Sequence, residues 1–500
     1  MLGRCRLTGA TLRGVEAKLV QVEISIGTGL PGVAIVGMAD TAVQEAKERV
    51  RSAIKASGFT MPRDKIVVNL APGSLRKSGS GFDLPIALGI LAASGQIPAE
   101  GLAGKLIVGE LALDGVLRDV PGMFAFELCA RETGLSLMCP TDTADVMPIE
   151  GVELIGIARL ADFKTGLFDI PHGVKSISGR ISDYQEVGGQ EMAKRALQVA
   201  AAGNHGLMMM GPPGSGKTML AERLPSILTP LDEGERLETA QVYSAAGEDM
   251  SAIVAGIRPF RHPHHSVSTA GLLGGGSPVR PGEVSLAHNG VLFLDEVSQF
   301  PRATLQGLRQ PMEDGRITIV RAEGAFTMPA RFMLIAASNP CPCGYLGDPE
   351  VRCKCSQTDI ISYQGRIGGP LIDRIDMQID VWRTSFDNVV HAGSDLSSAQ
   401  LREGVLRARE FRSWRMRRHP QVGADAGDGI EIPDLLSRNE VAPDGERFLR
   451  DAATANALSG RSIVRTVGVA RTIADIGESE QVREAHMAEA FALRLRESAR

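Results

Sequence analysis

The residues with the clearest chemical meaning form a glycine-rich segment near the middle of the chain. Residues 211–218 match the pattern G-x-x-x-x-G-K-[ST] at every position. In such a loop the backbone N–H groups surround nucleotide phosphates, Lys217 reaches the β- and γ-phosphates, and the hydroxyl of Thr218 binds Mg²⁺. The sequence therefore predicts a nucleotide phosphate site. Its residues are Gly211, Pro212, Pro213, Gly214, Ser215, Gly216, Lys217 and Thr218.

Two later segments supply the acidic and amide groups that such a site needs. Residues 290–296 read as a buried strand that ends in two acids, a Walker B pattern. Asp295 is expected to hold Mg²⁺ through water, and Glu296 to polarise the attacking water. The next apolar strand ends in Asn339, whose amide is suited to orienting that water. Together these groups predict ATP hydrolysis with ATP and Mg²⁺ as cofactors.

The elements around the loop fit this interpretation. Residues 206–210 read as a buried strand, and a helix opens at Met219. A helix directly after the loop adds positive potential at the phosphates. A glycine-rich turn with an incidental lysine is the alternative, and the flanking strand and helix argue against it.

Length and composition limit the class of protein. A chain of 500 residues is too long for one core and suggests roughly three domains. Its formal charge of −5 gives no global signature of polyanion binding, so nucleic-acid contacts require local basic patches. No apolar run approaches the ~20 residues that span a bilayer, and no signal-peptide core follows the N-terminus. We therefore expect a cytoplasmic protein with no membrane partner.

Four of the seven cysteines lie close together in the sequence, and an odd total argues against a secreted disulfide framework. Two C-x-C pairs can complete a tetrahedral thiolate site for Zn²⁺, which would brace a loop rather than do chemistry. The spacing departs from the commoner C-x-x-C, so a loop without metal stays the alternative. The four candidates are Cys341, Cys343, Cys353 and Cys355.

Two segments carry candidate nucleic-acid contacts. Residues 316–328 read as a β-hairpin with a turn at Glu323-Gly324 and with Arg321 beside that turn. Residues 401–419 hold seven arginines with interleaved aromatic residues. A solvated helix face and a nucleic-acid contact are both open interpretations of this second segment. Its candidates are Arg415, Arg417 and Arg418.

The first 168 residues alternate short strands and helices and carry a family resemblance. They resemble the N-terminal domain of the magnesium-chelatase-like AAA+ ATPases of the YifB/ComM type. The segments that carry the resemblance are Gly29-Leu-Pro-Gly32, Val36-Gly-Met-Ala-Asp40, Val68-Asn-Leu-Ala-Pro72 and Gly81-Phe-Asp-Leu-Pro-Ile86.

The resemblance implies an α/β fold with a P-loop AAA+ core, whose parallel sheet has helices on both faces. An N-terminal Lon-protease-like α+β domain and a C-terminal helical lid complete it. The expected boundaries are 1–168 for the N-terminal domain, 169–183 for a linker, 184–385 for the core and 386–500 for the lid.

The resemblance also implies roles for residues outside the loop. Residues 184–190 border the adenine in the family, so Val187 and Gln190 are candidates for base contact. Asn339 corresponds to sensor 1 and Arg461 to sensor 2. An insert around residues 257–276 and the hairpin are typical of the magnesium-chelatase branch, and such loops face the pore in ring-shaped relatives.

An arginine finger is the remaining role that the resemblance implies. Residues 371–377 resemble the finger segment, which makes Arg374 the candidate that reaches the γ-phosphate held by a neighbouring subunit. Arg366 is the alternative finger. A salt bridge of Arg374 with Asp373 or Asp376 is the structural alternative.

The family implies a hexameric, ATP-driven DNA motor with single-stranded or branched DNA as its partner. Its expected activity is that of a helicase that promotes branch migration of recombination intermediates during natural transformation. The residues themselves support ATP hydrolysis by a ring and do not show this substrate. A chelatase-type ATPase that remodels a protein partner is the alternative. A Lon-like ATP-dependent peptidase is a third, although the loop with Lys77, Ser78 and Ser80 lacks a convincing nucleophile motif.

Overall fold

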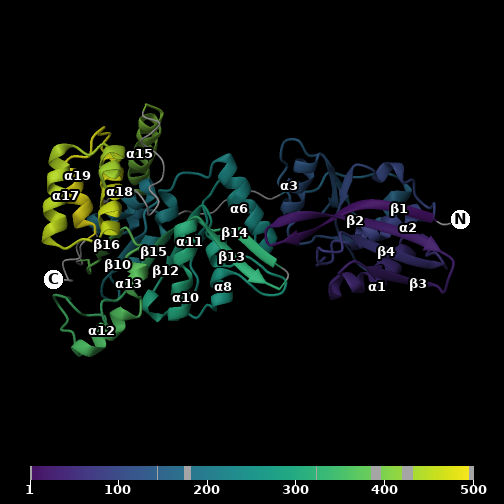
Figure 1. Cartoon of the computed structure of the whole chain (residues 1–500), viewed down its shortest axis with the longest axis horizontal. Helices are drawn as coiled ribbons and strands as arrows, with labels where there is room; N and C mark the ends of the chain where they lie inside the picture. Colours follow the sequence, from purple (N-terminus) through teal and green to yellow (C-terminus); the bar gives the residue numbers. More distant parts are fainter. Residues whose placement is uncertain are drawn as a thin grey trace.

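The computed structural model of the chain has three parts that follow one another along its length (Figure 1). It describes residues 3–143, 145–173, 182–322, 324–384, 396–418 and 432–494. A domain with a large sheet lies at one end, a second sheet with its helices lies in the middle, and helices near the C-terminus lie at the other end. The expected domain boundaries stay a prediction, and residues 174–181 of the linker lie outside the described ranges.

The N-terminal part is an α+β domain around a seven-stranded mixed sheet. In sheet order its strands are β3 (Gly32–Val36), β4 (Lys65–Ala71), β2 (Glu16–Gly27), β1 (Gly3–Arg13), β5 (Lys105–Ile107), β8 (Ser136–Pro140) and β9 (Leu154–Ile157). β1 and β2 form a long antiparallel hairpin that ends with Arg13 opposite Glu16. Every second residue of β2 from Val20 to Ile26 is buried, because successive strand side chains point to opposite faces. The remaining elements are β6 (Glu110–Leu111), β7 (Leu117–Arg118), α1 (Thr41–Ala56), α2 (Asp83–Ala93) and α3 (Met123–Thr133).

The middle part is a P-loop core around a parallel five-stranded sheet, as predicted. In sheet order its strands are β11 (Phe260–Arg261), β12 (Gly290–Leu294), β15 (Phe332–Ser338), β10 (Leu207–Met210) and β16 (Met377–Asp380). Leu207 and Met209 belong to one hydrophobic cluster, and Met208 and Met210 belong to another. Both faces of the sheet are therefore covered, which explains why β10 reads as a continuous apolar run.

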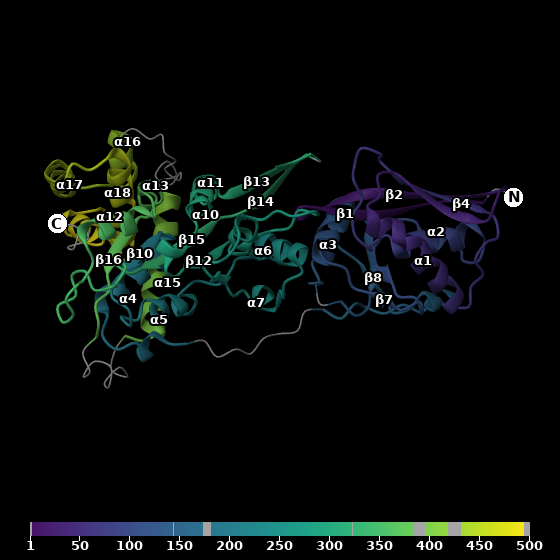
Figure 2. The same ribbon diagram turned by 90° about the horizontal axis from the view of Figure 1, so that it is seen from below.

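Helices and one hairpin surround this core sheet. The hairpin of β13 (Arg316–Arg321) and β14 (Gly324–Pro329) confirms the predicted one, with Arg321 paired to Gly324 at its tip, while Glu323 lies outside the described residues. It extends from the core toward the N-terminal domain (Figure 2). The helices are α4 (Glu191–Gly203), α5 (Lys217–Glu222), α6 (Glu233–Ala246), α7 (Ser251–Val254), α8 (Thr269–Leu273), α9 (Glu283–Leu286), α10 (Arg302–Gly307), α11 (Arg309–Asp314), α12 (Gln357–Gly365) and α13 (Gly369–Ile372).

The N-terminal domain docks on the core through α3 and α6. The N–H of Phe124 donates to Ser244 Oγ at 3.0 Å, and the N–H of Gly122 donates to the Ser244 carbonyl at 2.8 Å. Phe124 belongs to a hydrophobic cluster that also contains Tyr243 of α6 and Phe326 of the hairpin. The two domains therefore share buried apolar contacts beside the hairpin.

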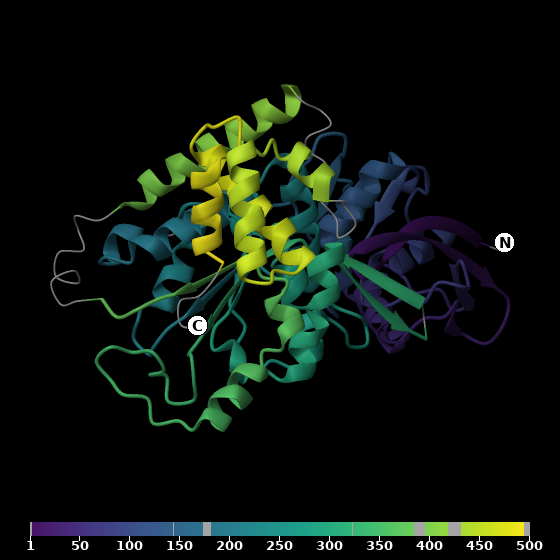
Figure 3. The same ribbon diagram turned by 60° about the vertical axis from the view of Figure 1, so that its left-hand side comes forward.

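The C-terminal part is helical, as predicted for the lid, and Figure 3 shows its helices grouped beside the core. Its helices are α15 (Ser398–Arg418), α16 (Ile432–Arg438), α17 (Pro443–Ala455), α18 (Gly460–Ile476) and α19 (Glu484–Ala492). Val405 of α15 and Val467 of α18 belong to the same hydrophobic cluster as Leu207 of the core sheet. None of the helices in the described ranges is both long and apolar enough to cross a bilayer.

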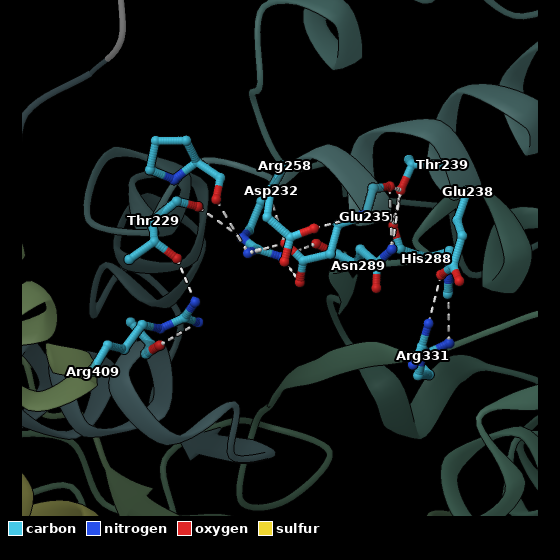
Figure 4. A network of polar contacts seen from close by, with 12 residues as sticks. Thr229, Asp232, Glu235, Glu238, Thr239, Arg258, His288, Asn289, Arg331 and Arg409 are labelled. Carbon is cyan, nitrogen blue, oxygen red and sulfur yellow. Dashed lines mark hydrogen bonds and ion pairs between the residues drawn. The ribbon is translucent and has the colours of Figure 1, made fainter. Parts of the chain in front are cut away.

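A polar network joins this helical part to the base of the hairpin (Figure 4). Arg409 of α15 donates to Thr229 Oγ1. Arg258 donates to the Thr229 carbonyl at 2.7 Å, to Glu235 at 2.6 Å and to the Asn289 carbonyl at 2.8 Å. Polar contacts thus connect α15, α6 and the residue before β12. The network continues through Glu238, His288 and Arg331 to the start of β15.

Candidate functional site

The predicted phosphate loop lies between the carboxyl end of β10 and the start of α5. At two positions of the loop the backbone geometry favours glycine. A Cβ at Gly211 would lie 2.0 Å from the Val381 carbonyl oxygen, so any side chain would clash with the neighbouring strand's backbone. Gly216 precedes α5 with a φ of 88°, in the left-handed region that glycine adopts without steric cost. The loop is therefore held close to the sheet and opens directly into a helix N-terminus.

Lys217 lies inside this loop. Its Nζ donates to the carbonyls of Gly211 and Pro212, both at 2.9 Å, and lies 3.4 Å from Asn339 Oδ1. Burial lowers the pKa of Lys217 to about 8, against the opposing effect of the Asp295 and Glu296 carboxylates. Lys217 thus lies inside the loop, where its ammonium group is held by backbone carbonyls at the predicted phosphate position.

This pKa leads to a prediction for nucleotide binding. The ammonium form of Lys217 is present below about pH 8 and lost above it, so ATP affinity should fall as pH rises, by up to about tenfold per pH unit. The measurement is the Kd of a fluorescent ATP analogue from about pH 6.5 to 9.5. Glu296→Gln removes a negative charge that raises the pKa of Lys217, so the fall in ATP affinity should begin at a lower pH in this variant. An affinity that is flat with pH in the unmodified protein would contradict this assignment.

The Walker B acids lie at the same edge of the sheet. Thr218 Oγ1 donates to Asp295 Oδ2 at 2.6 Å, so the two expected Mg²⁺ ligands are adjacent. The side chain of Glu296 is exposed and accepts a hydrogen bond from Gln299 Nε2 at 2.8 Å. Gln299 was not predicted from the sequence, although its position three residues after Glu296, in the turn after β12, is a signal for such a contact. Gln299 is placed to orient the Glu296 carboxylate.

The structure brings Gln190 to the loop and places Val187 in the core. Gln190 Nε2 donates to the Ser215 carbonyl at 3.1 Å and to the Trp382 carbonyl at 2.6 Å. Val187 is buried in the core cluster, and its carbonyl accepts from Lys194 Nζ at 2.6 Å. Gln190 therefore ties the backbone of the phosphate loop to the segment after β16, and base contact for either residue stays a prediction.

Arg374 and Arg461 lie away from the phosphate loop of their own chain. Arg374 comes before the amino end of β16 and pairs with Glu313 of α11. Asp376 pairs with Arg465.

Arg461 is exposed in the first turn of α18. Its neighbour Ser462 accepts from Arg494, which also donates to the Ile375 and Asp376 carbonyls before β16. This is the opposite edge of the parallel sheet from the loop. Within one chain, neither Arg374 nor Arg461 is brought to the predicted phosphate site. The alternative finger, Arg366, has an exposed side chain after α12.

The four clustered cysteines converge next to the loop. The Sγ atoms of Cys341, Cys343 and Cys353 lie 3.4 to 3.7 Å apart, and all four Sγ atoms lie within 4.8 Å of one another. Tetrahedral zinc with Zn–S bonds of about 2.3 Å requires sulfur atoms roughly 3.8 Å apart, so this thiol set fits Zn²⁺. A Cβ at Gly344 would lie 2.5 Å from Pro213 Cδ, so the cysteine loop packs directly against the phosphate loop.

The predicted DNA contacts have different environments. Arg321 at the hairpin tip and Arg417 on α15 have exposed side chains. Arg418 is exposed as well, pairs with Glu480 at 3.2 Å and lies over the Trp414 ring. These three positions remain available to a polyanion.

The prediction for Arg415 is wrong. Its side chain is only 4% exposed, and its guanidinium donates to Asp475 of α18 at 3.3 Å. Burial of this ion pair keeps Arg415 from any DNA phosphate. Its contacts hold α15 against α18.

Comparisons with known proteins cover nearly the whole chain. Residues 183–389 match the family described as magnesium chelatase, subunit ChlI. Residues 22–143 match the family described as subunit ChlI of Mg-chelatase, and residues 395–494 match the family of its C-terminal region.

Three similar proteins align with this chain over almost their full length. The protein YifB of Salmonella typhimurium (strain LT2) is 40% identical over 489 residues, which cover 96% of this chain and 95% of the relative. YifB of Escherichia coli (strain K12) is 39% identical over 492 residues with the same coverage. The competence protein ComM of Haemophilus influenzae (strain Rd) is 40% identical over 497 residues, again with 96% and 95% coverage.

Proposed function

Because the chain belongs to the magnesium-chelatase-like AAA+ ATPase family of YifB and ComM, we propose that it is an ATP-driven DNA motor. The observation that carries the ATPase part is the group of Lys217, Thr218, Asp295 and Asn339 at one edge of the parallel sheet. The observation that favours DNA is the exposed Arg321 at the tip of a hairpin that extends from the core. The substrate we propose is single-stranded or branched DNA, with helicase activity and branch migration of recombination intermediates as the outcome. One relative carries the name competence protein, which fits a role in natural transformation.

The chemistry follows from the positions of the side chains. Lys217 binds the β- and γ-phosphates, and Thr218 and Asp295 would hold Mg²⁺, which neutralises phosphate charge during transfer. Glu296 polarises the attacking water, with Gln299 holding the carboxylate and Asn339 orienting the water.

The same chemistry favours assembly into a ring. Arg374 and Arg461 lie at the other edge of the sheet, so each acts on a neighbouring subunit's nucleotide. We therefore propose a hexameric ring in which every active site is completed by an adjacent chain.

The test of the DNA function uses Arg321. DNA should stimulate ATP hydrolysis, and Arg321→Glu should remove most of this stimulation while basal hydrolysis stays largely intact, because the hairpin lies outside the nucleotide site. The measurements are ATPase rates with and without forked DNA and strand displacement on four-way junctions. Arg417→Glu, an exposed charge reversal on α15, is the contrasting variant and should weaken DNA binding only modestly. If DNA does not change the ATPase rate and no strand displacement is detected, the protein would instead be a motor that acts on a protein partner.

We also propose that the four cysteines hold structural Zn²⁺. Purified protein should contain stoichiometric zinc, and Cys353→Ser should lose it and lower the temperature of unfolding, because a structural zinc site contributes directly to folding. Metal analysis and thermal unfolding measure both effects. Cys5→Ser removes a thiol outside the cluster and should keep the metal. Zinc-free wild-type protein with unchanged stability would contradict this proposal.

A further inference from the structure

Exposed arginines from two domains converge at the hairpin of β13 and β14. Arg13, at the turn between β1 and β2, places its Cζ 5.5 Å from the centroid of the Phe326 ring. A Cβ at Gly324 would lie 2.5 Å from Arg13 Nη2, so the guanidinium of Arg13 rests on the backbone of the hairpin tip. The N-terminal domain therefore presents a positive charge beside the segment that carries Arg321.

The glycine-rich insert adds a third arginine to this surface. A Cβ at Gly275 would lie 3.3 Å from Arg321 Nη2, so Arg321 extends over the insert. Gly275 and Arg280 form an antiparallel bridge with N···O distances of 3.0 and 2.9 Å. The side chains of Arg13 and Arg321 thus lie against the hairpin tip and the insert, and the backbone of Arg280 pairs with the insert residue that Arg321 covers. We name Arg13, Arg280 and Arg321 the interdomain arginine site.

A cavity of about 430 Å³ is lined by Arg13 and by residues of both domains, including Pro278 and Val279 of the segment that leads to Arg280. Its polar lining is rich in hydroxyl groups and carries one carboxylate, that of Asp40. This carboxylate already accepts the N–H groups of Val43 at 2.9 Å and Gly79 at 3.3 Å. The lining is therefore suited to an anion more than to a cation. The residues that matter here are Arg13, Arg76, Ser74, Ser78, Ser277 and Phe326.

Among the described residues, the three arginines of the site lack the carboxylate partners that arginines in nearby segments have. In the adjoining segments Arg258 pairs with Glu235, Arg261 with Glu283, and Arg331 with Glu238. By contrast, no carboxylate in the part of the chain that the structure describes forms an ion pair with the arginines of the site, and all three are exposed. In a protein with a net charge of −5, such a concentration of uncompensated positive charge is local. Its counter-ions must come from solvent or from a bound polyanion.

We propose that the interdomain arginine site binds the phosphodiester backbone of a DNA strand as it passes the hairpin. The N-terminal domain then contributes Arg13 directly to the DNA path. Guanidinium groups donate paired N–H bonds to phosphate oxygens, and serine hydroxyls supply further donors. This inference rests on the proposed DNA function and extends it, because it assigns a substrate contact to a domain that holds no part of the nucleotide site.

The experiment measures binding of a fluorescently labelled single-stranded oligothymidylate by the full chain across a salt series. Each lost phosphate contact should reduce the slope of log K against log [salt] by about 0.7 and weaken binding about fivefold at 0.1 M salt. We expect this change for Arg13→Ala, and again for Arg280→Ala. Arg6→Ala is the matched control, because Arg6 lies on the same strand as Arg13 but pairs with Glu23 at 2.8 Å. Basal ATPase activity checks that each variant is folded.

The salt slope separates a phosphate contact from a structural clamp. Arg13→Lys retains a cation and should keep the wild-type slope, while Arg13→Ala should reduce the slope by about 0.7. Weaker binding of Arg13→Ala with an unchanged slope would mean that Arg13 only supports the hairpin, and this would overturn the inference. Wild-type binding in both Arg13→Ala and Arg280→Ala would also overturn it and leave the proposed motor standing. A wild-type protein that binds no DNA at any salt concentration would overturn both.

Discussion

At a pH well below the pKa of Lys217, Glu296→Gln is expected to bind ATP normally and to hydrolyse it at least ~100-fold more slowly than the unmodified protein. The side chain of Glu296 is exposed beyond β12, close to the Mg²⁺ ligands but not bonded to Thr218 or Lys217. Its replacement should therefore remove the proposed water-polarising group without disturbing the residues proposed to hold phosphate. Turnover by phosphate release and affinity by a fluorescent analogue measure the two properties separately.

The contrasting variant is Lys217→Ala, which should lose nucleotide binding itself. The Lys217 ammonium group donates hydrogen bonds to two loop carbonyls, so Lys217→Ala removes the positive charge from the predicted phosphate position. Near-normal turnover in Glu296→Gln would show that another group polarises the water and would end this assignment.

Arg374→Ala should also bind ATP but hydrolyse it at least ~1,000-fold more slowly, which is the loss typical of an arginine finger. In one chain Arg374 bonds to Glu313 at the sheet edge opposite the phosphate loop, so the target we propose for it is the nucleotide of an adjacent subunit. Mixing Arg374→Ala with Lys217→Ala subunits should restore part of the activity, because hybrid interfaces combine an intact finger with an intact phosphate loop. Steady-state ATPase rates over a range of mixing ratios measure this effect.

Two variants distinguish the finger from a structural ion pair. Glu313→Gln removes an ion-pair partner of Arg374 and should leave hydrolysis largely intact if Arg374 acts on phosphate. Equal losses in Glu313→Gln and Arg374→Ala would instead identify a salt bridge that stabilises the fold. Arg366→Ala tests the alternative finger, and loss of hydrolysis there alone would transfer the role to Arg366.

The sequence predicted the sheet core well because its signals are local. Buried parallel strands read as unbroken apolar runs, and the phosphate loop and the two acids directly follow such runs in β10 and β12. The hairpin was equally readable from its two short strands and central turn. Since the carboxyl ends of parallel strands meet at one edge, local motifs were enough to bring Lys217, Asp295 and Asn339 together.

The arginines were harder to predict because their roles depend on distant partners. Arg415, Arg417 and Arg418 form one run in the sequence, yet only Arg415 turns inward, where it meets Asp475 on another helix. The convergence of Arg13 with the hairpin likewise depends on how two domains dock, and no spacing in the sequence encodes it.

The hydrophobic cluster that contains Leu207, Val405 and Val467 has a mechanical consequence. It runs without a break from the central sheet into the C-terminal helices, and the polar network of Arg258 and Arg409 spans the same boundary. Large apolar contacts of this kind resist hinge motion between domains. We therefore expect the core and the C-terminal helices to move as one rigid body, without a hinge closure of the helices over the nucleotide. In the proposed ring, hydrolysis would then move whole subunits against one another.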